Sequence, residues 1–183
     1  MKRNLIIVIL ILFSAVAVWG SIDKENNESI KQDITLEKRK RLFRQNIPTI
    51  AIDFVGIPYR FGGNPQKSEA TDNSHLFFSI YYLAAKKAGL SYKNYLPMKY
   101  LLGNLKEVNE NDLKNGDLIV LNDNHAAMIY QVEKTGKIHL IYSSEKRQQV
   151  FSFTSDHVVF YVYWLENLKG FYRLPDTMLE PGD

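Results

Sequence analysis

The spacing of hydrophobic positions changes along the chain near residue 115. Between residues 73 and 88, apolar side chains recur every three or four residues, which predicts a helix with one buried face. These positions are Leu76, Phe77, Ile80, Leu83 and Ala84. After residue 115, short runs rich in Val, Ile, Tyr and Phe alternate with turn residues, a pattern typical of strands. The predicted strands are residues 117–121, 126–132, 137–142, 149–153 and 157–164.

Helices followed by strands predict an α+β fold, in which a helical half packs on an antiparallel sheet of about five strands. Two more helices are expected earlier in the chain. One is a surface helix over residues 34–43. The other is a short apolar helix over residues 49–55, just after Pro48, which suits a first helical position. Thr71 or Asp72 is expected to cap the long helix that follows, because each offers a side-chain oxygen to free backbone N–H groups.

The N-terminus has a composition of its own. Two basic residues precede an uncharged apolar run over residues 5–19, and polar residues begin at Ser21. This order is typical of a secretion signal. As a helix the run would span roughly 22 Å, which is less than the hydrocarbon core of a bilayer. We therefore expect residues 1–20 to be a signal peptide, with an uncleaved anchor as the alternative. Both interpretations place the rest of the chain outside the cytoplasm, in the periplasm or cell envelope.

The remaining chain divides into a linker and a domain. Residues 21–46 are polar and dense in charge, which indicates a linker that ends in a surface helix. Residues 47–183 form the globular part, and their number favours a single domain. Membrane contact is expected only through the N-terminal segment, if that segment stays uncleaved.

Composition removes several classes of function. The net charge of +3 is small and no basic stripe is interleaved with aromatic residues, so nucleic-acid binding is not expected. The chain has no cysteine, which excludes disulfides, thiolate metal ligands and a thiol nucleophile. Its histidines lack the close spacing that is typical of metal ligands. We therefore expect neither a metal nor a cofactor.

Several motifs occur in the order found in one family of hydrolases. They are Gly56-Ile57-Pro58-Tyr59-Arg60-Phe61-Gly62-Gly63, Asp72-Asn73-Ser74-His75, Asn115-Gly116-Asp117-Leu118, His125-Ala126-Ala127-Met128 and Leu140-Ile141-Tyr142-Ser143-Ser144. Over residues 47–174 this order resembles the NlpC-type papain-like cell-wall peptidases, which are gamma-D-glutamyl-diamino-acid endopeptidases. The family carries Asp-Cys-Ser-Gly at the start of the long helix, and this chain lacks that cysteine.

The resemblance implies a role for each matching position. Asn73 occupies the position of the nucleophile, His125 that of the base, and Tyr142 that of the residue that orients the base. Shifting the strand by three residues would put His139 in the orienting position instead. A carboxamide neither ionises at neutral pH nor acts as an acyl-transfer nucleophile, so catalysis by the family's route is not expected.

The resemblance also implies a substrate subsite. Tyr59, Asp72 and Ser74 match residues that line it and hold the free amine of a stem peptide, and a carboxylate beside a phenol suits an ammonium group. The residues themselves allow a plainer interpretation, in which Asp72 is a helix cap and Tyr59 packs within its loop.

These observations predict a non-catalytic relative of cell-wall peptidases. It would bind a peptidoglycan stem peptide or an envelope protein through the old active-site cleft. One alternative is an active peptidoglycan endopeptidase with a displaced nucleophile, for which Ser74 is the nearest candidate. The other is a protein-interaction module that captures partners through exposed aromatic residues such as Tyr92, Tyr95 and Tyr100.

Overall fold

The computed structural model describes residues 31–92 and 94–182. The chain falls into two compact units, Met1–Lys38 and Arg39–Asp183. The predicted signal segment, residues 1–20, lies outside the described residues. Within the described ranges, no helix combines the length and the apolar character that crossing a membrane requires.

Helical residues 39–52 open the second unit. Phe43, Ile47 and Ala51 recur every four residues and are fully buried, so they form one face of this helix. The sequence had suggested two separate helices here, because Pro48 is typical of a first helical position.

Pro48 is accommodated inside the helix by two hydrogen bonds between Arg44 and the distant residue Asn115. Proline has no N–H, so the carbonyl of Arg44, one turn earlier, has no helical donor. The Asn115 side chain donates to that carbonyl at 3.2 Å. The Arg44 guanidinium in turn donates to the Asn115 carbonyl at 2.9 Å. Because Asn115 lies far away in the sequence, local patterns could not reveal that the helix continues.

Helix α2, Asn73–Lys87, carries the functional positions at its first turn. Asp72 caps it by accepting a hydrogen bond from the His75 N–H, and Gly89 follows its end with a φ of 69°. Its apolar face is buried as predicted, except that Leu83 is 39% exposed. The fully buried apolar positions are Leu76, Phe77, Ile80, Tyr81, Ala84 and Ala85.

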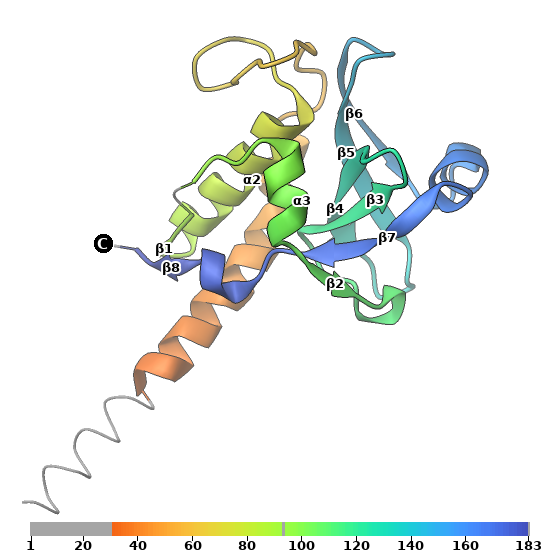
Figure 1. The fold of residues 1–183 in the computed structure, drawn as a ribbon. Coiled ribbons are helices and arrows are strands. Elements are labelled where there is room, and N and C mark those ends of the chain that lie inside the picture. The colour runs from red at the N-terminus through yellow and green to blue at the C-terminus, as the bar shows by residue number, and fades with distance from the viewer. Residues whose placement is uncertain (1–30, 93, 183) are drawn as a thin grey trace, which may run out of the picture. The chain divides into compact units, whose positions relative to one another are not determined.

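The main sheet has six strands in the order β2-β7-β3-β4-β5-β6, and neighbouring strands are antiparallel (Figure 1). The strands are β2 Lys106–Val108, β3 Asp117–Leu121, β4 Ala126–Val132, β5 Ile138–Ser144, β6 Gln149–Thr154 and β7 Leu168–Arg173. A second, two-stranded sheet pairs β1, Leu90–Ser91, with β8, Glu180–Pro181, and the short helix α3 covers Met98–Asn104. The predicted α+β class is confirmed.

The last predicted strand is wrong. Residues 158–165 are helical and end in a π-helical turn, Phe160–Leu165. Phe160 and Trp164 are buried and lie four residues apart, whereas Tyr161 and Val162 are exposed. This burial has a helical period, so tertiary packing overrides the local preference of Val, Tyr and Phe for strands. The last strand of the main sheet along the chain is instead β7, which pairs with β2 and β3.

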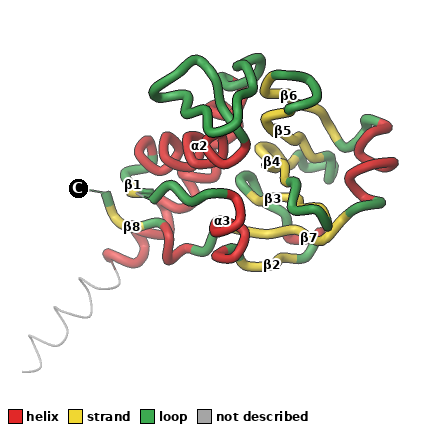
Figure 2. Tube along the Cα trace, turned by 45° about the horizontal axis from the view of Figure 1, so that its top comes forward, coloured by secondary structure: helices red, strands yellow, loops and turns green. Residues whose placement is uncertain are grey.

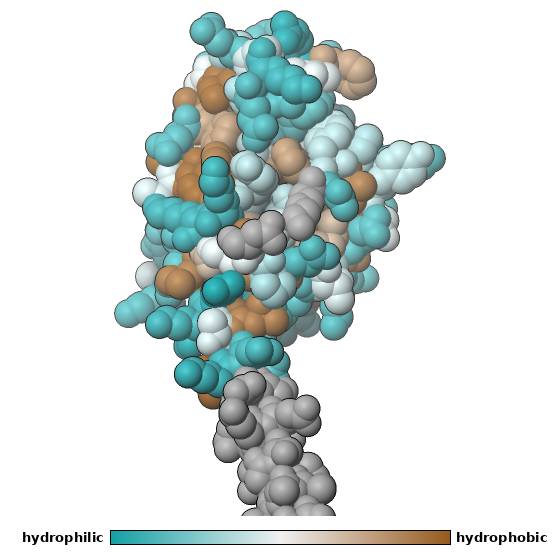
Figure 3. Space-filling view, turned by 90° about the vertical axis from the view of Figure 1, so that its left-hand side faces the viewer, coloured by the Kyte–Doolittle hydropathy of each residue, from teal (hydrophilic) through white to brown (hydrophobic). Residues whose placement is uncertain are grey.

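Helices lie on both sides of the main sheet. Figures 1 and 2 show α2 and helical residues 39–52 on one side, and the helical turn 158–165 on the other. The core on the latter side consists of Ile119, Leu121, Ala127, Ile129, Leu140, Phe153, Phe160 and Trp164 among others. On the face drawn in Figure 3, hydrophobic residues form separate patches among hydrophilic ones.

Candidate functional site

A cleft of about 1080 Å³ opens where the start of α2 meets the ends of β4 and β5. Its size suits a ligand larger than a single amino acid. Six of the candidate site residues line it, from segments far apart in the chain, whereas the alternative candidate His139 does not. The six residues are Tyr59, Asp72, Asn73, Ser74, His125 and Tyr142.

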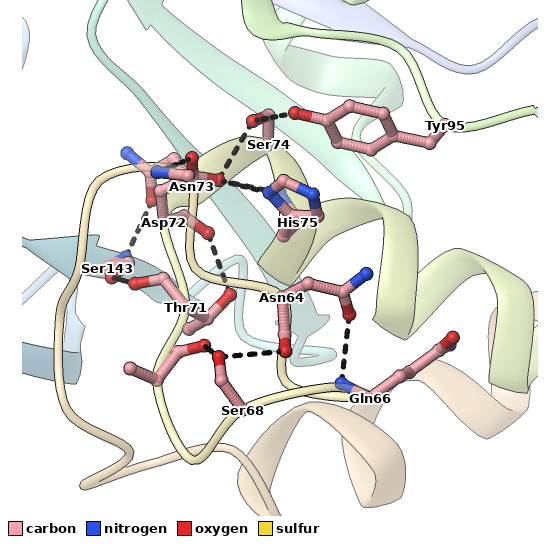
Figure 4. A network of polar contacts seen from close by, with 12 residues as sticks. Asn64, Gln66, Ser68, Thr71, Asp72, Asn73, Ser74, His75, Tyr95 and Ser143 are labelled. Atoms are coloured by element: carbon pink, nitrogen blue, oxygen red, sulfur yellow. Dashed lines mark hydrogen bonds and ion pairs between the residues drawn. The ribbon is translucent and has the colours of Figure 1, made fainter.

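Asn73, the first residue of α2, connects the helix to two strands. Its Nδ2 donates to the Ala126 carbonyl of β4 at 3.3 Å, and its Oδ1 accepts from the Ser143 N–H of β5 at 2.6 Å (Figure 4). The opposite orientation of the amide would place donor against donor and acceptor against acceptor, so these partners determine it. The Asn73 side chain therefore holds α2 on the sheet.

Asp72 is surrounded by donors. Its Oδ1 accepts from the Ser74 hydroxyl, the His75 N–H and the His75 ring at 2.8, 2.9 and 3.1 Å. Its Oδ2 accepts from the Gly62 N–H at 2.9 Å. Burial alone would raise the pKa of Asp72, but the hydrogen bonds from His75, Ser74 and Gly62 lower it below the usual range of an aspartate. The carboxylate thus caps α2 and anchors the preceding loop, its Oδ2 keeps acceptor capacity, and the residue lines the cleft.

Ser74 and Tyr95 form a second contact at the start of α2. The single hydrogen of the Ser74 hydroxyl goes to Asp72, so the Tyr95 hydroxyl donates to Ser74 Oγ, at 3.0 Å. The Tyr95 ring also stacks on His75, with a centroid distance of 4.1 Å (Figure 4). Among the described residues, no imidazole accepts a proton from Ser74. A relocated serine nucleophile therefore lacks an imidazole base in this arrangement, and the acceptor of its proton is the Asp72 carboxylate.

His125 stands in the turn before β4, paired with a residue that the sequence analysis missed. Its Nδ1 lies 2.9 Å from Asp123 Oδ2, and its N–H donates to Asp123 Oδ1 at 2.9 Å. These hydrogen bonds, the backbone one first, lower the pKa of Asp123. The His125 side chain is 65% exposed. An Asp-x-His sequence in a turn is the signal that could have indicated this pair.

Tyr142 belongs to β5 and points away from α2. Its ring packs edge-on against Trp164 and Phe153, with centroid distances of 5.5 and 6.0 Å. Within the described part of the chain it makes no hydrogen bond to His125. His139, the alternative for this position, lies outside the cleft, and its Nε2 is 2.6 Å from Glu133 Oε1. Odd and even residues of β5 face opposite sides of the sheet, which separates the two candidates.

Tyr59 lies on the loop before α2 and is half-buried. Its N–H donates to the Gln148 carbonyl at 2.9 Å, and an isolated bridge pairs it with Thr71. Burial raises the pKa of Tyr59, and the carboxylates of Glu145 and Asp72 raise it further. The phenol is therefore neutral at physiological pH and can donate a hydrogen bond into the cleft.

Sequence reasoning missed one wall of the cleft. Val159, Val162, Tyr163 and Trp164 line it from the helical turn that had been predicted as a strand. The turn between β5 and β6 adds Glu145, Lys146 and Arg147. Among the described residues, no group of three or more His, Asp or Glu side chains is placed to hold a metal ion.

Comparison with known proteins finds similarity in fold. No family model matches the chain, and no curated protein matches it. Among solved structures, a lipoprotein-like protein of the NLP/P60 family from Staphylococcus aureus subsp. aureus Mu50 is 21% identical over 72% of this chain and 41% of its own, with a TM-score of 0.52. The peptidoglycan hydrolase RipB from Mycobacterium tuberculosis is 16% identical over 73% and 65%, with a TM-score of 0.47.

The likeness to the staphylococcal structure identifies the fold as the NlpC-type papain-like one, as the motifs had predicted. The chain spans 41% of the length of that protein. A shared fold hosts many activities, so the chemistry of this chain has to be argued from its own cleft.

Proposed function

We propose that this chain is a non-catalytic relative of cell-wall peptidases that binds a peptidoglycan stem peptide through the cleft. One observation carries the proposal: the nucleophile position holds Asn73, whose amide is engaged with Ala126 and Ser143. A side chain that neither ionises nor is free to attack cannot start acyl transfer.

The rest of the cleft supports a binding role. The large opening combines aromatic rings, which offer apolar contact, with polar and charged side chains, which can orient a ligand by hydrogen bonds. Tyr59, Asp72 and Ser74 serve as the subsite for the peptide's amine, with Asp72 Oδ2 and the Tyr59 hydroxyl facing the ligand. His125 is a polar wall of the site, and Tyr142 is part of its aromatic lining.

The setting is the cell envelope. The apolar run over residues 5–19 exports the chain, and the site faces peptidoglycan once the chain has left the cytoplasm. An envelope protein is the second candidate occupant. It is favoured by Val158, Tyr161, Val162 and Tyr163, which are between 42% and 64% exposed on the helical turn that borders the cleft.

A sedimentation assay tests binding and cleavage together. The full chain, purified in a mild detergent, is mixed with intact sacculi and centrifuged, and soluble fragments are analysed by mass spectrometry. We expect the wild type to sediment and to release no fragments. Tyr163→Ser should weaken sedimentation, whereas Tyr100→Ser should not, because Tyr100 is even more exposed (61% against 42%) but lies outside the cleft. Fragment release by the wild type would contradict the non-catalytic assignment. Absence of sedimentation would contradict the proposal that the ligand is a peptidoglycan stem peptide.

Asn73→Cys tests whether the position is that of the nucleophile. Cleavage by this variant, lost again when His125→Ala is added, would support a retained substrate geometry. Silence of a folded Asn73→Cys variant would argue against the stem peptide and for an envelope protein as the occupant.

A further inference from the structure

The turn between β5 and β6 places two cations in the cleft. Lys146 and Arg147 both line it, and both are exposed. In the described ranges, residues 31–92 and 94–182, neither side chain forms an ion pair with a carboxylate. The other charged residue of the turn is Glu145, so the turn carries one net positive charge.

The backbone of this turn is held in place. The Arg147 N–H donates to the buried Ser144 hydroxyl at 3.2 Å, and the Gln148 N–H donates to the Glu145 carbonyl at 3.2 Å. Gln148 adopts a φ of 57°, which closes the turn. Its carbonyl accepts from the Tyr59 N–H at 2.9 Å, and this ties the turn to the loop that precedes α2 (Figure 1).

The Arg147 side chain is also oriented. Its guanidinium lies over the Phe151 ring, 3.9 Å from the centroid. Stacking uses one face of the planar group and leaves the N–H edge free, and this edge matches the two oxygens of a carboxylate. Phe151 itself packs against Tyr142, which lines the cleft. The cation is therefore preorganised before any ligand arrives.

We infer that Lys146 and Arg147 form a carboxylate subsite, so that the cleft selects peptides carrying a free carboxylate. This inference rests on the proposed function, because it assigns the ligand of the same cleft. A singly charged anion is favoured over a phosphate group, since Glu145 and Asp72 also border the space and repel higher negative charge. Neither cation belongs to the positions that the motif order singled out.

A pair of peptides tests the subsite. The full chain in mild detergent is titrated by calorimetry with L-alanyl-γ-D-glutamyl-L-lysine, once with free carboxylates and once with every carboxyl group amidated. We expect the wild type to bind the free acid at least about tenfold more tightly. Binding of the free acid should also weaken as salt is raised, because exposed charges are screened.

The double variant K146Q/R147Q should lose this preference and the salt dependence while keeping its affinity for the amidated peptide. Lys134→Gln is the matched control, because Lys134 is an exposed turn lysine outside the cleft. Thermal melts establish that each variant is folded. Inorganic phosphate and acetate are also compared as competitors of the free-acid peptide. If phosphate displaces the peptide as well as acetate does, the choice of a carboxylate is wrong.

Failure of the inference and of the proposed function are distinguishable. If the wild type binds both peptides equally, or if K146Q/R147Q keeps the preference, the carboxylate subsite is wrong and the cleft remains a peptide site. If the wild type binds neither peptide, the stem-peptide function fails and the subsite fails with it.

Discussion

Two polar clusters of this molecule are built from similar groups but have opposite surroundings. At Asp117 the carboxylate is fully buried and accepts hydrogen bonds from Arg173 Nε at 2.9 Å, from Arg173 Nη2 at 2.7 Å and from the Lys114 N–H at 2.8 Å. Arg44 adds a longer contact at 3.4 Å. At the cleft, Asn73 is equally engaged, but His125, Lys146 and Arg147 beside it face solvent.

The difference separates stability from function. Around Asp117, one carboxylate meets two guanidinium groups from other elements, so the cluster joins helical residues 39–52, β3 and β7. Around Asn73 the inner groups hold the fold together, while the outer ones keep unused hydrogen-bonding capacity. Substitutions should therefore divide into those that unfold the chain and those that only change its cleft.

The largest effect is expected at the buried cluster. Asp117→Ala would leave two guanidinium groups without their partner, and breaking a buried ion pair in this way costs about 3–5 kcal/mol. Urea denaturation at neutral pH measures the loss. Lys137→Gln is the control, since its ion pair with Asp156 lies at the surface, where solvent screens it, and its removal should cost far less. Equal losses in the two variants would contradict the comparison.

Asn73→Ala should have the next largest effect. It leaves the Ser143 N–H and the Ala126 carbonyl without their partner, and an unpaired buried group costs about 1–3 kcal/mol. The same urea experiment detects it. Asn104→Ala removes an exposed side-chain bond within one helix and should cost much less. An Asn73→Ala variant as stable as the wild type would show that the amide does not hold α2 on the sheet.

Asp72→Asn should change how stability depends on pH. The folded-state pKa of Asp72 is lowered, so its charge stabilises the fold above the unfolded pKa of about 3.9 and this contribution is lost as pH falls through the folded value. The variant should be about 1 kcal/mol less stable at pH 7, in line with a weakened helix cap. Its disadvantage should shrink below pH 4. Thermal melts between pH 2 and 7 test this, and a constant difference would contradict it.

The smallest effect on the free energy of unfolding is expected at the exposed His125–Asp123 pair. His125→Ala should change stability by no more than about 0.5 kcal/mol, because both partners of the His125–Asp123 contact are more than half exposed. A thermal melt beside the wild type is sufficient. A larger loss would place His125 with the structural groups rather than with the cleft.

The parts of the fold that depend on local spacing could be predicted. The face of α2, its Asp72 cap and the strands β3 to β6 follow from periodicity and turn residues, which act over a few positions. The motif order also indicated which residues share the cleft. Failures came where distant contacts decided, as at Pro48, where Asn115 supplies the missing donor. The helical turn 158–165 is a second case, because burial of Phe160 and Trp164 outweighs strand preference.

The sequence by itself determined the absence of a thiol and the presence of an amide side chain at residue 73, since both are matters of covalent composition. It also determined the α+β order of elements, because that order lies along the chain. Only the tertiary structure decided what Asn73 bonds to, and that Lys146 and Arg147 enter the cleft. These depend on distances between segments that no local pattern encodes, because packing of the whole sheet sets them.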